Sequence, residues 1–115
     1  MKVAVVGSRG LHITDLGAYL PPGTTEIISG GAVGIDTCAA DYARSRSLKL
    51  TVFKPNYDRY GGKAAPLIRN RLIVDAADMV LAIWDGRSRG TMFTVNYARQ
   101  IGKPVEVVRI LCNRG

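Results

Sequence analysis

Ligand chemistry is suggested first by the segment Gly7-Ser8-Arg9-Gly10, which follows an apolar run at the start of the chain. The Ser8 hydroxyl can donate to a phosphate, and the Arg9 guanidinium can bind one through two N–H groups. We expect Gly7 and Gly10 to adopt positive φ and to let the backbone approach a ligand closely. A plain polar turn is the structural alternative for this segment alone.

The second segment spans residues 29–36 and has glycines at positions 30, 31 and 34. It precedes a predicted helix, so Gly30, Gly31 and Ala32 can present backbone N–H groups to an anion. Its spacing matches neither the dinucleotide fingerprint nor the Walker loop. Asp36 falls in the first helical turn, where the helix dipole stabilises a carboxylate, and this structural role is the simpler interpretation.

The third segment, residues 84–91, follows the most apolar run of the chain. Asp85, Ser88, Gly90 and Thr91, with Thr94 beyond them, are expected to form a second cradle for phosphate or ribose at a helix start. A Gly90-Thr91 helix cap explains part of the run. Trp84 is expected to pack in the core rather than to stack on a base.

A fourth segment, Arg69-Asn70-Arg71, lies on a predicted helix. Neighbouring residues of a helix point in different directions, so only one of the two arginines is expected to reach a ligand. The predicted ligand-binding residues are Gly7, Ser8, Arg9, Gly30, Gly31, Ala32, Asp36, Arg69, Asn70, Asp85, Ser88, Gly90, Thr91 and Thr94. We predict no metal ligands and no cofactor, because no cluster with metal-ligand spacing is present.

Strands and helices alternate along the chain and position these segments. The predicted strands are 2–6, 26–29, 50–53, 79–84 and 104–110, and the predicted helices are 14–20, 33–47, 65–76 and 91–101. Residues 55–63 are predicted to be a loop. This alternation predicts an α/β fold with a doubly wound parallel sheet in the order 3-2-1-4-5. Ligands bind such sheets at the carboxyl ends of the strands, where all four segments would meet.

Composition supports one reduced, intracellular domain over residues 1–115. Apolar residues make up 47% of the sequence, and Cys38 and Cys112 are predicted to be small core side chains. No segment is long enough to be a signal peptide or a membrane span, so a cytoplasmic location is expected. The net charge of +7 favours anionic partners, although solubilising surface charge is the simpler interpretation of the net charge alone.

In order, the four segments resemble the Rossmann-like superfamily that contains the DNA-processing protein DprA/Smf and the Lonely-guy (LOG) proteins, and the resemblance runs from Val3 to about Val108. It implies a nucleotide-related ligand, and it suggests stand-alone sensors of bacterial stress or phage conflict. Relatives of this type commonly form dimers. The glutamate that serves catalysis in LOG proteins is absent, so the hydrolase activity of those proteins is not expected here.

Three functions follow, of which binding or sensing of a nucleotide-derived, phosphorylated ligand is the first. Single-stranded DNA binding, as in DprA-like proteins, is the second, with Tyr57 and Tyr60 as possible stacking platforms. Hydrolysis of a nucleotide N-glycosidic bond is the third, with Asp36 or Asp85 as acid or base. Apolar side chains around Leu67, Leu72 and Phe93 also suggest a homodimer.

Overall fold

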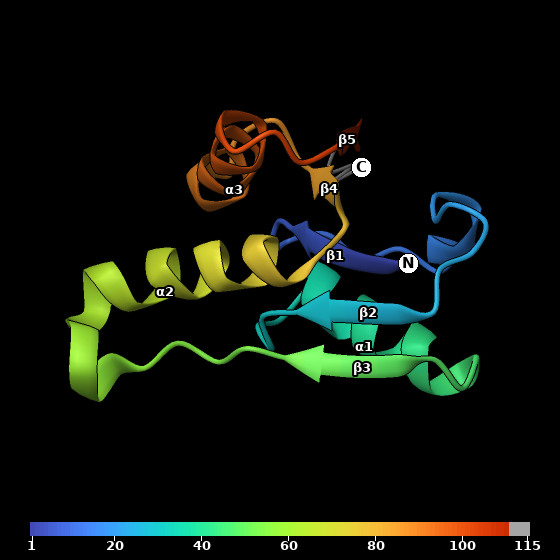
Figure 1. Cartoon of the computed structure of the whole chain (residues 1–115), viewed down its shortest axis with the longest axis horizontal. Helices are drawn as coiled ribbons and strands as arrows, with labels where there is room; N and C mark the ends of the chain where they lie inside the picture. The colour runs from blue at the N-terminus through green and yellow to red at the C-terminus, as the bar shows by residue number, and fades with distance from the viewer. Residues whose placement is uncertain (111–115) are drawn as a thin grey trace.

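A computed structural model describes residues 1–110 of the chain, which form one five-stranded parallel sheet with helices on both faces (Figure 1). The strands are β1 (Lys2–Gly7), β2 (Glu26–Ser29), β3 (Lys49–Val52), β4 (Met79–Trp84) and β5 (Val105–Arg109). The helices are α1 (Ile35–Ser45), α2 (Tyr57–Ala76), α3 (Arg89–Gln100) and the short 3-10 helix η1 (Leu16–Ala18). The strand order is β3-β2-β1-β4-β5, as predicted from the alternation of strands and helices.

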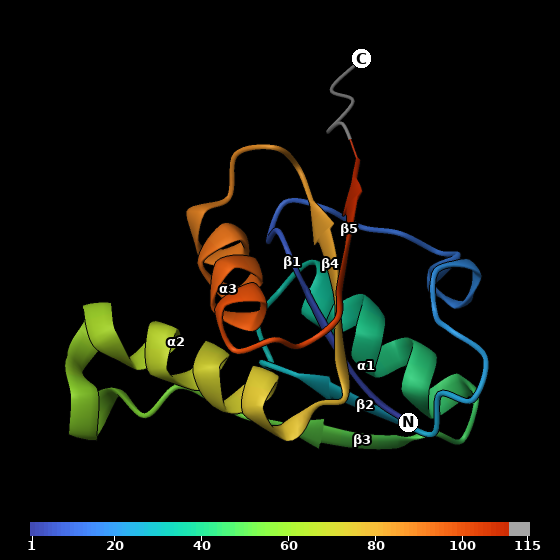
Figure 2. The same cartoon turned by 45° about the horizontal axis from the view of Figure 1, so that its top comes forward.

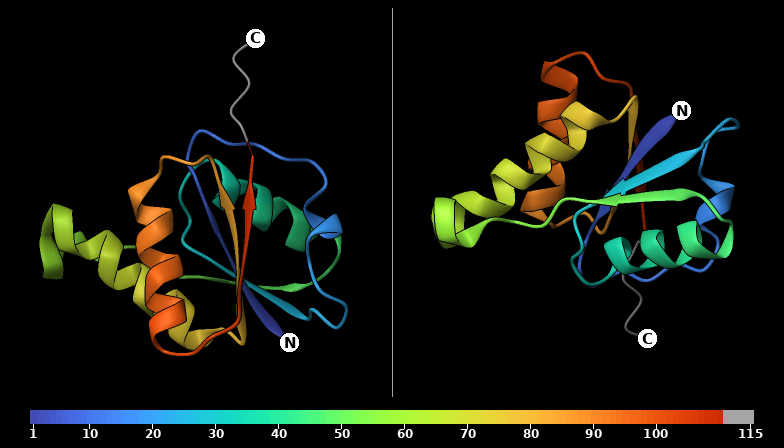
Figure 3. Two further views of the ribbon diagram at one scale, coloured as in Figure 1. Left: turned by 90° about the horizontal axis from the view of Figure 1, so that it is seen from above. Right: turned by 60° about the horizontal axis from the view of Figure 1, so that its bottom comes forward.

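Each face of the sheet has its own hydrophobic core. Val3 and Val5 of β1 pack on the side of α1 and η1, whereas Ala4 and Val6 pack on the side of α2 and α3. Figures 2 and 3 show α1 on one face and α2 with α3 on the other. Burial on both faces explains why the inner strands are continuous apolar runs rather than alternating ones.

The β1–β4 pair places the candidate site. These strands are neighbours from Val3 opposite Met79 to Gly7 opposite Ile83, although the chain between them visits the other half of the sheet. The loop after β1 leads to η1, on the face that α1 covers, whereas the loop after β4 leads to α3 on the opposite face. A crevice at the carboxyl edge therefore opens between them, as expected at a topological switch point.

Two predicted elements differ from the structure. Most of the predicted loop 55–63 is helical, because α2 begins at Tyr57, where the Asn56 side chain accepts a hydrogen bond from the Arg59 N–H. Gly61, with φ +79°, bends this helix, so its first turn and its main body point in different directions. The predicted helix 14–20 is only the 3-10 turn η1, whose first position lacks a side-chain cap.

Smaller corrections concern the helix starts. The first residue of α1 is Ile35, because Gly34 has φ +80° and cannot belong to the helix. Helix α3 is capped by Ser88, whose side chain accepts from the Thr91 N–H, and not by Gly90 and Thr91. Cys38 is buried as predicted, whereas Cys112 lies outside the described residues. Among residues 1–110, no helix is both long and apolar enough to cross a membrane.

Candidate ligand-binding site

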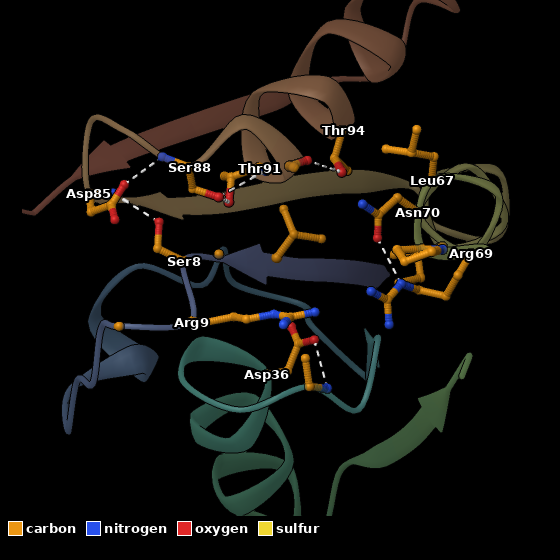
Figure 4. Close-up of a pocket in the computed structure, with 17 residues that line it drawn as sticks. Ser8, Arg9, Asp36, Leu67, Arg69, Asn70, Asp85, Ser88, Thr91 and Thr94 are labelled. Atoms are coloured by element: carbon orange, nitrogen blue, oxygen red, sulfur yellow. Dashed lines mark hydrogen bonds between the residues drawn. The ribbon is translucent and has the colours of Figure 1, made fainter. Parts of the chain in front are cut away.

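A cavity of about 440 Å³ lies at the carboxyl edge of the sheet, beside the ends of β1 and β4. It brings together every predicted ligand-binding residue except Gly30 and Gly31. Figure 4 shows side chains converging on it from the loops after β1 and β4, from α2 and from the first turns of α1 and α3. The predicted residues that line it are Gly7, Ser8, Arg9, Ala32, Asp36, Arg69, Asn70, Asp85, Ser88, Gly90, Thr91 and Thr94.

The loop after β1 is held to β4 by the buried Ser8. Its Oγ accepts a hydrogen bond from the Asp85 N–H at 3.1 Å. Gly7 and Gly10 do not have positive φ, so that expectation was wrong. A Cβ on Gly7 would lie 2.5 Å from the Ile83 carbonyl oxygen and 2.6 Å from Ile35, so close packing of the strand end requires this glycine. The next residue in this loop, Arg9, is exposed and borders the cavity.

In the glycine-rich loop after β2, the Asp36 carboxylate already accepts a hydrogen bond from one of the backbone N–H groups. The Ala32 N–H donates to Asp36 Oδ2 at 3.1 Å, and the Gly31 N–H donates to Ser29 Oγ at 3.4 Å. Gly31 has φ +72°. The carboxylate of Asp36 thus takes the Ala32 donor that we expected to hold a phosphate.

Asp36 is a half-buried acid that borders the cavity. Burial raises its pKa above the ordinary value of 3.8, because a charged carboxylate loses solvation there. The Ala32 N–H and the positive charges of Arg69 and Arg9 oppose this shift. For Asp85 the pKa is lowered by the N–H groups of Arg87 and Ser88, so of the two acids Asp36 is the better placed to carry a proton.

Arg69 and Gly30 form a structural pair. Arg69 Nη1 donates to the Gly30 carbonyl oxygen at 2.6 Å, and its Nε donates to Asn70 Oδ1 at 2.8 Å. A Cβ on Gly30 would lie 2.6 Å from the same Nη1, so Gly30 makes room for the arginine rather than for a ligand. Arg71 lies over the rings of Phe93 and Tyr97 instead, which confirms that only one of the two arginines reaches the cavity.

The hydroxyls at the start of α3 form hydrogen bonds within that segment. Ser88 Oγ lies 3.0 Å from Thr91 Oγ1, and Thr94 Oγ1 donates to the Gly90 carbonyl oxygen at 2.9 Å. Within residues 1–110, the N–H groups of Arg89 and Gly90 have no hydrogen-bond partner. Unpaired N–H groups at a helix start attract anions, and Gly90 lines the cavity.

A second cavity of about 460 Å³ adjoins the first and shares Arg9, Ala32 and Arg69 with it. Gly30 and Gly31 border this second cavity. Trp84 lines neither cavity, and its Nε1 donates to the Ser88 carbonyl oxygen at 3.0 Å. Part of the site therefore extends beyond the crevice between β1 and β4, toward the start of α2.

Several lining residues were not predicted, namely Val6, Pro66, Leu67 and Ile73. Pro66, Asn70 and Ile73 follow helical spacing, so they share one face of α2. Applying that spacing to Arg69 and Asn70 would have found Pro66 and Ile73. In the described part of the chain, no three His, Cys, Asp or Glu side chains come close enough together to hold a metal ion.

No protein-family model matches the sequence, and no curated protein matches it either. Solved structures do. The chain has the fold of DNA processing protein A. The Helicobacter pylori protein, whose single-stranded DNA binding mode has been described, aligns with a TM-score of 0.72 and 24% identity over 98% of this chain and 67% of its own. The Streptococcus pneumoniae protein aligns with a TM-score of 0.70 and 22% identity over 98% of this chain and 52% of its own.

Proposed function

We propose that the protein binds a phosphorylated, nucleotide-type ligand in the cavity at the carboxyl edge of the sheet. The observation that carries this proposal is the convergence of Arg9 with the unpaired N–H group of Gly90 on one cavity. A guanidinium and the N-terminus of a helix both bind phosphate groups favourably, so the two together suit a phosphorylated ligand. The Ser8 and Ser88 hydroxyls border the same space.

Arg9 is available for such a ligand. In the described residues the ion pairs join Arg44 to Asp41 and Lys49 to Glu26, so no carboxylate lies within ion-pair distance of Arg9. Arg69 is committed to Gly30 and Asn70 and is expected to act through its charge. Asp36 places a negative charge on the same wall, which would disfavour a phosphate there and direct it toward α3.

Single-stranded DNA is the second candidate ligand. It is supported by the fold shared with the H. pylori protein, which binds single-stranded DNA, and by the net charge of +7. The adjoining cavity extends the cationic surface past Arg9 to Lys54. A strand could follow this surface from one cavity to the next.

Thermal melting with mononucleotides and with an oligodeoxynucleotide tests both candidates. Saturation by a mononucleotide at a hundredfold excess over Kd should stabilise the fold by about 2.7 kcal/mol and raise Tm by roughly 10 °C. An oligonucleotide should instead bind with an affinity that falls steeply with salt. Each phosphate neutralised should add about −0.7 to the slope of the logarithm of the binding constant against the logarithm of the salt concentration.

Arg9→Ala should weaken binding of either ligand at least tenfold, because it removes a charged contact inside the cavity. Arg87→Ala is the matched control, since Arg87 is exposed and borders neither cavity. Binding that is lost equally in both variants would point to general charge rather than to this site. If no nucleotide shifts the melting curve while the oligonucleotide binds, DNA replaces the small ligand as the proposed function.

A further inference from the structure

We propose that the second cavity is a subsite for a planar nucleobase, which rests on the proposed function of its neighbour. It is lined by Tyr57, Val33 and Lys54, which do not border the first cavity, and by Arg9 and Arg69, which border both. The ring held there would belong to the same ligand whose phosphate lies beside α3. The shared chemistry is a flat aromatic ring, carried by a mononucleotide or by a DNA strand.

The two cavities are placed to hold one ligand. They share Arg9, Ala32 and Arg69, so these three residues form the boundary between the two spaces. Figure 4 shows the Arg9 side chain extending from the loop after β1 in the direction of Arg69, and both side chains line both cavities. A guanidinium at that boundary can contact a phosphate on one side and lie over an aromatic ring on the other.

Tyr57 supplies the stacking surface. Tyr57 is 52% exposed, and Val33, in the loop after β2, is 65% exposed, so both present apolar area that the fold does not bury. Tyr60 differs, because the Arg59 guanidinium lies 5.3 Å from the centre of its ring and it does not border the cavity. The helical turn ended by Gly61 thus directs one tyrosine to the site and leaves the other outside.

The charge of the second cavity also fits this ligand. Arg9, Lys54 and Arg69 border it, and no aspartate or glutamate does. The first cavity, in contrast, includes Asp36 and Asp85. An aromatic ring that lies near cations while its phosphate is neutralised is typical of binding sites for nucleotides and single strands.

Calorimetric titrations of Tyr57→Ala test the subsite with three probes. AMP carries both base and phosphate, ribose 5-phosphate carries the phosphate without a base, and a short oligodeoxythymidylate carries the strand. Loss of a stacking partner should weaken AMP or the oligonucleotide by about fivefold or more. Binding of ribose 5-phosphate should not change.

Tyr57→Phe keeps the ring and should bind like the wild type, and Tyr60→Ala is the matched control for removal of an exposed tyrosine. If Tyr57→Ala weakens the binding of AMP, the ring belongs to a mononucleotide. If it weakens the binding of the oligonucleotide alone, the ring belongs to a DNA strand. Equal weakening of AMP and ribose 5-phosphate, or equal effects of Tyr57→Ala and Tyr60→Ala, would overturn the subsite. If the wild type binds none of the probes, the proposed function itself fails.

Discussion

Two arginines at the site, Arg9 and Arg69, have different physical roles. Arg69 is buried and donates to the Gly30 carbonyl oxygen, whereas Arg9 is exposed at the cavity wall. Removing a buried donor leaves its acceptor without a partner, and that loss costs about 1–3 kcal/mol. The same truncation at an exposed position has a small effect on stability.

We therefore predict that Arg69→Ala lowers the free energy of unfolding by about 1–3 kcal/mol, while Arg9→Ala leaves it nearly unchanged and weakens ligand binding. Urea denaturation monitored by the fluorescence of Trp84 measures the first quantity for both variants. Equal stability of the two variants would show that the Arg69–Gly30 contact contributes little to the fold.

The raised pKa of Asp36 makes stability depend on pH. Between the ordinary value of 3.8 and the raised value, the folded protein binds more protons than the unfolded chain. The free energy of unfolding contributed by this group therefore falls as the pH rises through that interval, and it stays low above it. At neutral pH the ionised carboxylate is a destabilising group, which is tolerated beside the Ala32 N–H.

Asp36→Asn should consequently raise Tm at neutral pH and lose this advantage as the pH is lowered below about 3.8. An asparagine oxygen can still accept from the Ala32 N–H, so the loop should keep its shape. The variant should also bind inorganic phosphate more tightly, because a negative charge leaves the cavity. Melting curves across pH and phosphate titrations check both effects, and a variant less stable at every pH would contradict the assignment.

The loops at the sheet edge contain glycines that serve different purposes. A Cβ on Gly34 would lie 2.4 Å from the Arg9 carbonyl oxygen, and its φ of +80° already disfavours other residues. Gly90, in the first turn of α3, has nothing within 4 Å of that position. Gly34 allows its loop to contact the loop that carries Arg9, and Gly90 leaves the first turn of α3 accessible.

Gly90→Ala should stabilise the protein by about 0.5–1 kcal/mol, because alanine restricts the unfolded chain and favours the helix. It should also weaken ligand binding, since the added methyl group lies at the cavity wall beside an unpaired N–H. Gly34→Ala should destabilise the fold by about 1–3 kcal/mol. Denaturation and ligand titration of both variants test this contrast, and a stabilised Gly34→Ala would refute the role given to the loop contact.

At the scale of the whole molecule, α2 leaves apolar side chains uncovered. Leu67 is 39% exposed and Leu72 is 47% exposed, and the nearby Phe93 lies under the Arg71 guanidinium. We predict that these exposed side chains pair in a homodimer, because association would bury area that the single chain exposes. Light scattering at micromolar concentration should give twice the chain mass. Leu72→Glu should return the monomer, whereas Ile101→Glu, at another exposed apolar position, should not, and a monomeric wild type would refute the dimer.

The order and class of the elements could be read from the sequence alone. Buried parallel strands must be continuous apolar runs, and the residues after them must turn toward helices, so both signals are local. Because parallel strands all end at one edge, Ser8, Asp36 and Ser88 could be assigned to one site although they are far apart in the chain. The expectation that residues 1–115 form a single domain stays a prediction.

Only the tertiary structure decided how the site residues are used. Arg69 meets Gly30 across 39 positions of sequence, and its hydrogen bond to that carbonyl leaves Arg9 as the exposed cation that borders the cavity. The helical turn at Tyr57, which the local pattern suggested was a loop, separates that ring from Tyr60 and opens the second cavity. Such contacts join groups that are far apart in the sequence. The residues next to each group in the chain therefore do not reveal its partner.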